Sequence, residues 1–254
     1  MEKSPPNPAQ PSGLQLFTTE RITYGHTVGT ATRDNLMIEL SHRLGPDIAR
    51  RAFWLTQEHT PRLASSFPHP PGTVADGFFL EETGTVGIIR TADCTPLFFW
   101  DDAGETAGLV HVGWRGLAAG ILTNWTRMLN QRQSSLSVMN VWLGPAIEGR
   151  CYAVGNELPK MFFEPSAGFW GFSHNSRARW TLDIRNGITS FLQATGIPAH
   201  RIRRSGVCTF CSREFPSYRR QGPGCGRILN FILRHPHPSS QSVRRGTGRT
   251  GLTD

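Results

Sequence analysis

Short apolar runs bounded by polar residues recur along the middle of the chain. They occupy residues 53–60, 86–93, 95–102, 107–114 and 137–147, and the last ends at a Gly-Pro turn. Runs of this length with polar boundaries are typical of strands. The first run, "FWLTQEHT", is expected to be a strand that ends at a polar tip.

Three segments repeat apolar residues at helical spacing instead. Residues 33–52 do so up to Gly45-Pro46, residues 116–131 follow the run at 107–114 directly, and residues 182–197 continue to Gly196. The spacing predicts helices, with a break at the first Gly-Pro and a stop at the last glycine. Interspersed strands and helices indicate an α+β class: a single mixed α/β domain with a layered sheet core and flanking helices.

The chain of 254 residues is long enough to bury a large core as one domain. Both ends are rich in Pro and Ser and have little to bury. We therefore expect a flexible tail at 1–13, one domain at 14–234 and a flexible tail at 235–254. His235 and His237 are interpreted as solvated tail residues and not as metal ligands.

Basic residues outnumber acidic ones by 27 to 19, which gives a net charge of +8. Much of the excess lies in one C-terminal stretch: Arg201, Arg203, Arg204, Arg213, Arg219, Arg220 and Arg227. Such a surplus suits phosphate or another anion. No zinc-finger spacing, RNA-recognition signature or basic helix accompanies it, so nucleic acid is not the expected partner.

Cysteine usage and hydropathy bear on the compartment. The five cysteines are an odd, dispersed set, which is poor material for a disulfide framework. The first residues carry no apolar signal core, and no run of about 18 apolar residues could span a bilayer. We expect a cytoplasmic protein with no membrane partner, and the sequence indicates no oligomeric state.

Three side chains at strand ends could hold a metal. Cys94 and His111 lie on consecutive predicted strands, and His59 lies at the tip of an earlier one. Two imidazoles and a thiolate are good zinc ligands and leave a fourth position open, as catalytic sites do. One zinc ion is the expected cofactor. Copper is an alternative occupant, because it accepts the same donors.

The same residues allow other interpretations. Cys94 could be a buried small apolar residue and His111 a satisfied core histidine. Cys94 could also be a nucleophile with His111 as its base, in a thiol hydrolase acting on peptidoglycan-type amides. A third alternative is a non-catalytic anion or nucleic-acid binder that depends on the arginines.

The sequence segments around these residues resemble those of a known family. The segments "TQEHT", "TADCTPLFF", "VHVGWRGLAAGI", "WLGPAIEGRCYAVG", "LDI" and "CTFCSREFPSYRR" follow in order between Gln57 and Phe231. Together they resemble the laccase-domain family of multicopper polyphenol oxidoreductases, also called purine nucleoside phosphorylases or, in bacteria, peptidoglycan editing factors. The resemblance implies zinc ligands at His59, Cys94 and His111.

The resemblance also implies activities. Family members are described as cleaving purine nucleosides, including methylthioadenosine, with phosphate, as deaminating adenosine, and as oxidising phenols. A trinuclear copper cluster needs many His-x-His pairs. This chain has 9 histidines and one such pair, at 235–237. We therefore favour a zinc-dependent purine nucleoside phosphorylase, with polyphenol oxidase activity as an alternative.

Substrate contacts are expected from the motifs beside the ligands. Arg115, Arg219 and Arg220 are candidates for binding phosphate, because guanidinium groups are permanently charged planar forks. Tyr218 is a candidate for stacking on the purine. Asp93, next to Cys94, is a candidate for proton transfer, and a carboxylate that caps the local turn is the alternative.

Several positions depart from the family pattern or stay open. Thr60 stands where the family has glycine, which is expected to reshape the mouth of the site. Asp76 matches the family's Ala-Asp block, and His26 is expected to be a loop histidine and no fourth ligand. The Cys208 and Cys211 pair is interpreted as packing, because no second pair completes a four-cysteine zinc site.

Overall fold

The computed structural model describes residues 13–46, 51–64, 72–162, 171–174 and 180–236. Its strands are β1 (Leu14–Thr18), β2 (Ile22–Thr27), β3 (Ala52–Trp54), β4 (Gly77–Phe79), β5 (Val86–Thr91), β6 (Thr95–Asp101), β7 (Ala107–Val112), β8 (Met139–Leu143), β9 (Ala153–Val154), β10 (Gly171–His174), β11 (Trp180–Asp183), β12 (Ile202–Arg204) and β13 (Ile228–Arg234). Its α-helices are α1 (Arg33–Leu44), α2 (Trp114–Ala118), α3 (Ile121–Gln131), α4 (Glu157–Lys160), α5 (Ile184–Ala194) and α6 (Tyr218–Gln221).

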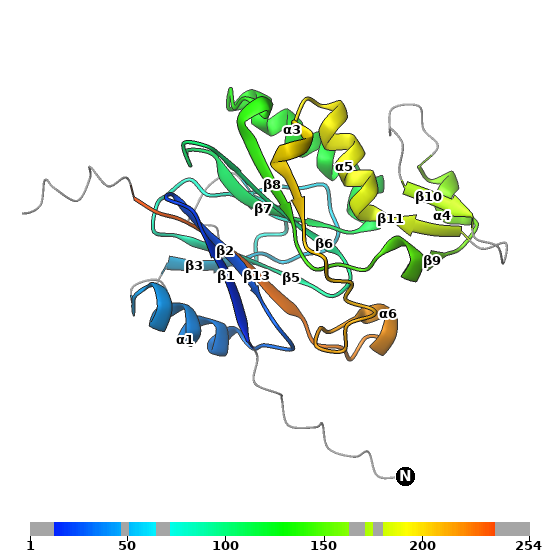
Figure 1. Cartoon of the computed structure of the whole chain (residues 1–254), viewed down its shortest axis with the longest axis horizontal. Helices are drawn as coiled ribbons and strands as arrows, with labels where there is room; N and C mark the ends of the chain where they lie inside the picture. Colours follow the sequence, from blue (N-terminus) through cyan, green and yellow to red (C-terminus); the bar gives the residue numbers. More distant parts are fainter. Residues whose placement is uncertain (1–12, 47–50, 65–71, 163–170, 175–179, 237–254) are drawn as a thin grey trace, which may run out of the picture.

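Two five-stranded sheets form the centre of the molecule (Figure 1). The first has the order β1-β2-β13-β5-β3 and the second β12-β8-β6-β7-β4. A three-stranded sheet, β10-β11-β9, lies to one side. Most neighbours are antiparallel, but β3 pairs with β5 and β12 with β8 in parallel. This arrangement confirms the mixed α/β class expected from the sequence.

Successive side chains along the strands point to opposite faces of the sheets, and the buried ones form three apolar layers. Ile89 and Phe98 belong to the layer between the two sheets, whereas their neighbours Ile88 and Phe99 face the opposite way. Ile88 packs with α1, and Phe99 packs with α3 and α5. Since successive strand side chains point to opposite faces, a sheet buried on both faces needs consecutive apolar residues. The layers therefore follow the order α1, first sheet, second sheet, and α3 with α5.

Two predicted elements differ from the expectation. The helix expected over 116–131 is broken into α2 and α3 because Gly120 adopts a left-handed conformation, with φ at 86°. The strand expected over 53–60 ends at Trp54. Beyond it, the Gln57 side chain accepts from the Arg90 backbone N–H at 2.7 Å and donates to its carbonyl at 2.9 Å. A side chain thus replaces the strand backbone beside β5.

The remaining predictions concern the helix ends, His26 and the tails. Helix α1 ends at Gly45, as the Gly-Pro signal predicts. His26 is buried within β2, so its expected place in a loop is wrong. His235 hydrogen-bonds to Thr23 Oγ1 at 2.7 Å and so contacts the domain, whereas His237 lies outside the described residues. Among the described residues, no helix is long and apolar enough to cross a membrane.

Candidate metal centre and its cavity

Strands β6 and β7 bring Cys94 and His111 side by side. Cys94 directly precedes β6, whose residue Pro96 is paired with His111 of β7, and Thr95 is paired with Val112. An antiparallel pair holds residues opposite one another within about 4.5–5.5 Å. Two residues 17 positions apart thereby meet at one end of the second sheet, as the predicted strands indicated.

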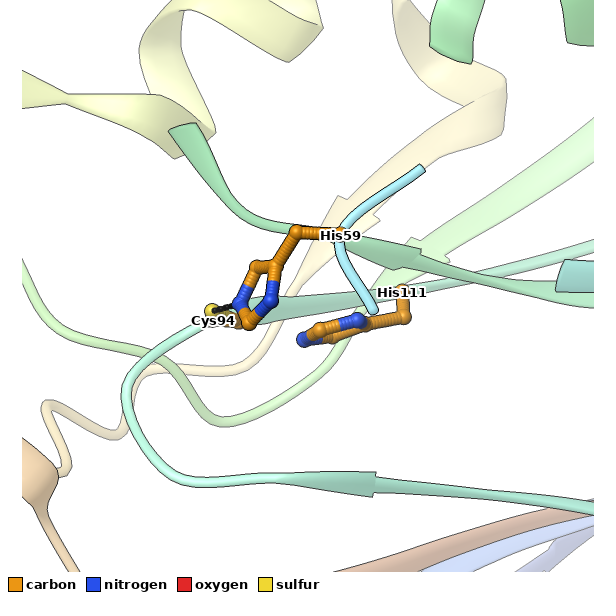
Figure 2. Close-up of side chains that lie close together, drawn as sticks. All are labelled: His59, Cys94 and His111. Carbon is orange, nitrogen blue, oxygen red and sulfur yellow. Dashed lines mark hydrogen bonds between the residues drawn. The ribbon is translucent and has the colours of Figure 1, made fainter. Parts of the chain in front are cut away.

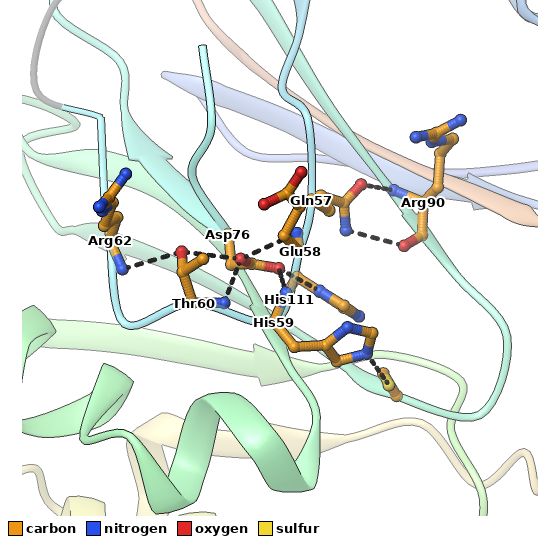
Figure 3. Close-up of polar contacts among 9 residues, drawn as sticks. Gln57, Glu58, His59, Thr60, Arg62, Asp76, Arg90 and His111 are labelled. Carbon is orange, nitrogen blue, oxygen red and sulfur yellow. Dashed lines mark hydrogen bonds and ion pairs between the residues drawn. The ribbon is translucent and has the colours of Figure 1, made fainter. Parts of the chain in front are cut away.

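His59 reaches the same point from a loop organised by Asp76. The backbone N–H groups of Glu58, His59 and Thr60 donate to the buried Asp76 carboxylate at 3.3, 3.0 and 2.6 Å (Figure 3). His59 takes a left-handed conformation, with φ at 58°, which is uncommon for a residue other than glycine. Three donors on one carboxylate hold the loop in this conformation.

Thr60, which replaces the glycine of the family pattern, adds a contact to this loop. Its hydroxyl donates to Asp76 Oδ2 at 2.9 Å and accepts from the Arg62 N–H at 3.2 Å. The left-handed residue is His59, so Thr60 does not need the freedom of glycine. The substitution therefore adds a hydrogen bond to the loop that carries the metal-ligand candidate.

Asp76 also orients His111. Its Oδ1 lies 2.8 Å from His111 Nδ1, and its backbone carbonyl accepts from the His111 N–H at 2.6 Å. Burial alone would raise the pKa of Asp76, but His111 and the Thr60 donors lower it overall. The ionised carboxylate accepts a hydrogen bond from Nδ1–H. Nε2 is then the ring nitrogen that could bind a metal, an arrangement found around histidines that bind metals.

The three side chains fit one metal ion. Each offers a donor atom, and these atoms lie within 4.8 Å of one another; Cys94 Sγ is 3.7 Å from His59 Nε2 (Figure 2). A tetrahedral zinc ion with usual bond lengths of about 2.3 Å to sulfur and 2.0–2.1 Å to nitrogen sets those atoms about 3.6 Å apart. The donor set and its spacing therefore match the expected metal site.

The two histidines stabilise the thiolate form of Cys94. Removal from water would raise the pKa of Cys94, but the nearby His111 and His59 lower it to about 6. Burial would lower the pKa of His111, but the Cys94 sulfur and Asp76 raise it to about 9. At neutral pH these shifts favour a thiolate on Cys94 and a protonated His111, and a cation that binds here would displace the proton from His111.

The Asp93 carboxylate binds the start of helix α6. Asp93 is buried, with φ at 83°, and its carboxylate accepts from Thr209 Oγ1 at 2.6 Å, Ser217 Oγ at 3.1 Å and the Arg219 N–H at 2.7 Å. Three donors occupy its oxygens. Its carboxylate therefore fixes the loop that begins α6, which is the alternative expected from the sequence. Asp93 also lines the cavity described below, so its role in proton transfer stays a prediction.

A cavity of about 510 Å³ opens over the three candidate ligands. Its lining includes His59, Cys94 and His111, as well as Arg115, Tyr218 and Arg219 from the sequence prediction. The Arg115 guanidinium lies 4.5 Å from the centre of the Trp114 ring. Arg219 lies 4.7 Å from the centre of the Tyr152 ring and also donates to the Ala153 carbonyl. Two arginines, each beside an aromatic ring, thus line the cavity.

Arg220 does not line the cavity. Its Nη1 donates to the carbonyls of Thr209, Phe210 and Ser212 at 2.8, 2.6 and 3.0 Å, and its Nη2 donates to Phe215. The expected role in binding substrate is therefore corrected: Arg220 holds the loop before α6. Tyr218, by contrast, is 52% exposed at the cavity, where its ring is free to meet a ligand.

Sequence reasoning missed several lining residues. Gln57, Arg90, Trp114 and Tyr152 all face the cavity, and none was singled out for the site. Trp114 and Tyr152 fall inside the quoted family segments, so an aromatic residue beside a candidate ligand was a usable signal. Gln57 also lies in a quoted segment, two residues before His59, whereas Arg90 carried no such signal, because only the folded backbone brings it to Gln57.

Known proteins resemble this chain in sequence and in fold. A protein named purine nucleoside phosphorylase from Pseudomonas aeruginosa is 34% identical over 205 residues, covering 76% of this chain and 78% of that protein. One of the same name from Shigella flexneri is 30% identical, covering 73% and 75%. The crystal structure of the hypothetical protein YfiH from Bacillus licheniformis superposes with a TM-score of 0.73 at 22% identity, covering 84% and 92%.

The family model described as multi-copper polyphenol oxidoreductase laccase matches residues 31–235. The matched stretch contains both sheets except β1 and β2, the three candidate ligands and the cavity lining. The chain belongs to the multi-copper polyphenol oxidoreductase laccase family, and the two relatives compared by sequence above are named purine nucleoside phosphorylases.

Proposed function

We propose that this protein is a zinc-dependent purine nucleoside phosphorylase. The observation that carries the proposal is one cavity in which a His-Cys-His donor set faces arginine and aromatic side chains. The names of the relatives support the same reaction class. The reaction needs a phosphate site, a surface for the purine and a group that assists the departing base, and the cavity offers candidates for each.

His59, Cys94 and His111 would hold the metal. Bound there, zinc supplies Lewis-acid chemistry: it polarises a substrate atom in phosphorolysis or activates water in deamination. The chain's own contribution is to keep the three donors in place. Asp76 does this for both histidines at once, because its carboxylate binds the His59 loop and the His111 ring.

Arg115 and Arg219 are the candidates for holding phosphate. Both line the cavity, and each guanidinium is supported by an aromatic ring. A planar fork of permanent charge suits two phosphate oxygens. In the reaction, a phosphate oxygen forms a bond to C1′ of the ribose while the bond from C1′ to the purine nitrogen breaks. Positioned arginines would bring the attacking oxygen to C1′ and offset its charge.

The departing purine takes the bonding electron pair and needs a hydrogen-bond donor or a proton. Tyr152 lines the cavity, and its burial, with the nearby Cys94 sulfur, raises the pKa of its phenol well above the usual value. The phenol therefore stays protonated and can donate a hydrogen bond. Tyr218, exposed at the same opening, offers a ring for stacking on the base.

Product analysis tests the proposal. The zinc-loaded protein is incubated with adenosine, inosine and methylthioadenosine, each with and without phosphate, and the products are separated. We expect free base that depends on phosphate, and its loss in His111→Ala. Inosine formed from adenosine without phosphate would show an adenosine deaminase activity in addition to phosphorolysis. No turnover of any nucleoside would refute it.

Two variants separate the roles. Arg115→Ala is expected to raise the KM for phosphate more than the KM for the nucleoside, and Tyr152→Phe to lower kcat with both KM values nearly unchanged. The thiol-hydrolase alternative predicts a different pattern: an active metal-free protein that loses activity when Cys94 is alkylated. Measuring turnover after metal removal therefore decides between the two mechanisms.

A further inference from the structure

A second cluster of metal-ligating side chains lies away from the candidate active site. Cys151 closes a 3₁₀ turn at Gly149–Cys151, and Cys208 and Cys211 belong to the loop after β12. Their sulfur atoms lie within 4.8 Å of one another, and Cys151 Sγ is 3.3 Å from Cys211 Sγ. The structure thus adds a third sulfur to the Cys-x-x-Cys pair that the sequence alone left as packing.

Backbone contacts hold the two segments together. Ala146 and Cys208 form a parallel bridge, and the Thr209 N–H donates to the Ala146 carbonyl at 3.1 Å. The Glu148 N–H points at Cys208 Sγ, 3.4 Å away. Cys208 is buried, whereas Cys211 is exposed. The cluster therefore has one fixed sulfur at its base and one sulfur at the surface, where an ion can enter.

Two arginines lie beside the cluster, although burial and the neighbouring sulfurs raise the pKa of the Cys151 thiol when no cation is bound. Arg150 pairs with Glu148 at 2.7 Å. Arg185, which is buried, lies 3.5 Å from Glu148 and interacts with Cys208. Two cationic side chains thus lie around three sulfurs. Three thiolates so close would still repel one another, and a cation placed between them removes that repulsion.

The sulfur positions suit a metal with thiolate ligands. Bonds of about 2.3 Å in a tetrahedron set sulfur atoms about 3.8 Å apart, between the observed 3.3 Å and the 4.8 Å limit of the group. Thiolates select zinc and monovalent copper over harder cations. We propose that Cys151, Cys208 and Cys211 form a second metal site for a thiophilic d¹⁰ cation, with zinc as the expected ion and a solvent-facing fourth position.

The site would fix one wall of the cavity. Tyr152, which lines the cavity, directly follows Cys151. Thr209, which directly follows Cys208, donates to the Asp93 carboxylate beside Cys94. An ion bound to both segments therefore ties Tyr152 to the loop that precedes α6. Its role is structural, and its existence does not depend on the reaction proposed above.

Metal counting tests the proposal. Fully reduced, metal-free protein is loaded with Zn²⁺, desalted and measured by elemental analysis, with competition against a chromophoric chelator. We expect two ions per chain in the wild type, one in Cys211→Ser and one in Cys94→Ala. Cys225→Ser is the matched control, because Cys225 lies in neither donor group, and it should keep two. One ion in the wild type that Cys211→Ser retains would overturn the proposal.

Cadmium and copper give independent readouts. The thiolate-to-metal absorption of Cd²⁺ should be about three times stronger in Cys94→Ala than in Cys211→Ser, since three thiolates bind in one and one thiolate in the other. If Cys94→Ala does not fold, the wild type compared with Cys211→Ser still decides. Stoichiometric Cu⁺ binding in place of Zn²⁺ would mark a three-coordinate site of the same class. Fully reduced protein that takes up neither Zn²⁺ nor Cu⁺ at these three cysteines would overturn the proposal.

Discussion

Gly113 offers a sharp test of the metal centre. It lies between β7 and α2, next to the candidate ligands. A Cβ atom added there would stand 2.8 Å from His59 Cδ2 and 2.9 Å from Cys94 Sγ. Ordinary contacts between such atoms are about 3.5–4.0 Å, so at least one ligand must move by more than half an ångström. Metal sites tolerate only about 0.2 Å.

The size of the effect follows from the cost of overpacking. Forcing an extra carbon into a well-packed site costs about 1–3 kcal/mol. If that strain falls on the metal-bound state, Gly113→Ala weakens zinc binding about 5- to 150-fold. Gly116→Ala is the matched control, three residues along in α2. Its added Cβ meets nothing closer than 3.6 Å, which is ordinary contact.

The assay is zinc competition with a chromophoric chelator, alongside a thermal melt of each metal-free variant. Gly113→Ala should lose affinity and Gly116→Ala should match the wild type. The binding should be measured in the Cys211→Ser background, so that only one class of site is titrated. Wild-type zinc affinity in Gly113→Ala would refute the geometry, since the three donors could not then lie where the structure places them.

Three further predictions follow from single side chains. Asp76→Asn should lower metal affinity about 10- to 100-fold, because side chains that orient metal ligands contribute that much. Chelator competition measures the affinity, and circular dichroism should show an intact fold. Unchanged affinity would contradict the role given to Asp76. Arg220→Lys should lower the free energy of unfolding in urea by about 1–3 kcal/mol, because the Arg220 guanidinium donates hydrogen bonds to backbone carbonyls. The KM for phosphate should stay unchanged. A raised KM with unchanged stability would instead indicate that Arg220 binds substrate. Burial lowers the pKa of His26 below 6.5, so the unfolded chain binds more protons and stability should fall as the pH drops below about 6.5. Urea unfolding across pH should show a shallower loss in His26→Phe, whose ring can replace the imidazole between Trp142 and Phe215; an equal slope would exclude His26 as the source.

Local patterns predicted the centre of the site well. Cys94 and His111 lie at the ends of two strands with clear apolar periodicity, and a hairpin between them is a local structure. His59 was also indicated, as the tip of an apolar run, and the resemblance to the family implies the same ligand. The strand ends earlier than that run suggests, and Asp76 binds the loop that brings His59 to Cys94.

Contacts between distant segments were beyond sequence reasoning. Arg219 and Arg220 are adjacent and chemically identical, yet one faces the cavity and the other binds loop carbonyls. That difference depends on where helix α6 begins, which the Asp93 carboxylate determines through the Arg219 N–H. Cys151 likewise joins Cys208 and Cys211 only because its turn packs on their loop.

The three candidate ligands differ in how the fold supports them, so metal affinity and the stability of the scaffold can change separately. His111 lies in the second sheet and Cys94 directly precedes its strand β6, whereas His59 belongs to a loop held by hydrogen bonds to a single carboxylate. Changes in residues 57–62 can therefore retune how tightly an ion is retained, or how fast it exchanges, with little effect on the stability of the scaffold. Relatives with different residues in this loop are natural variants in which to measure that range.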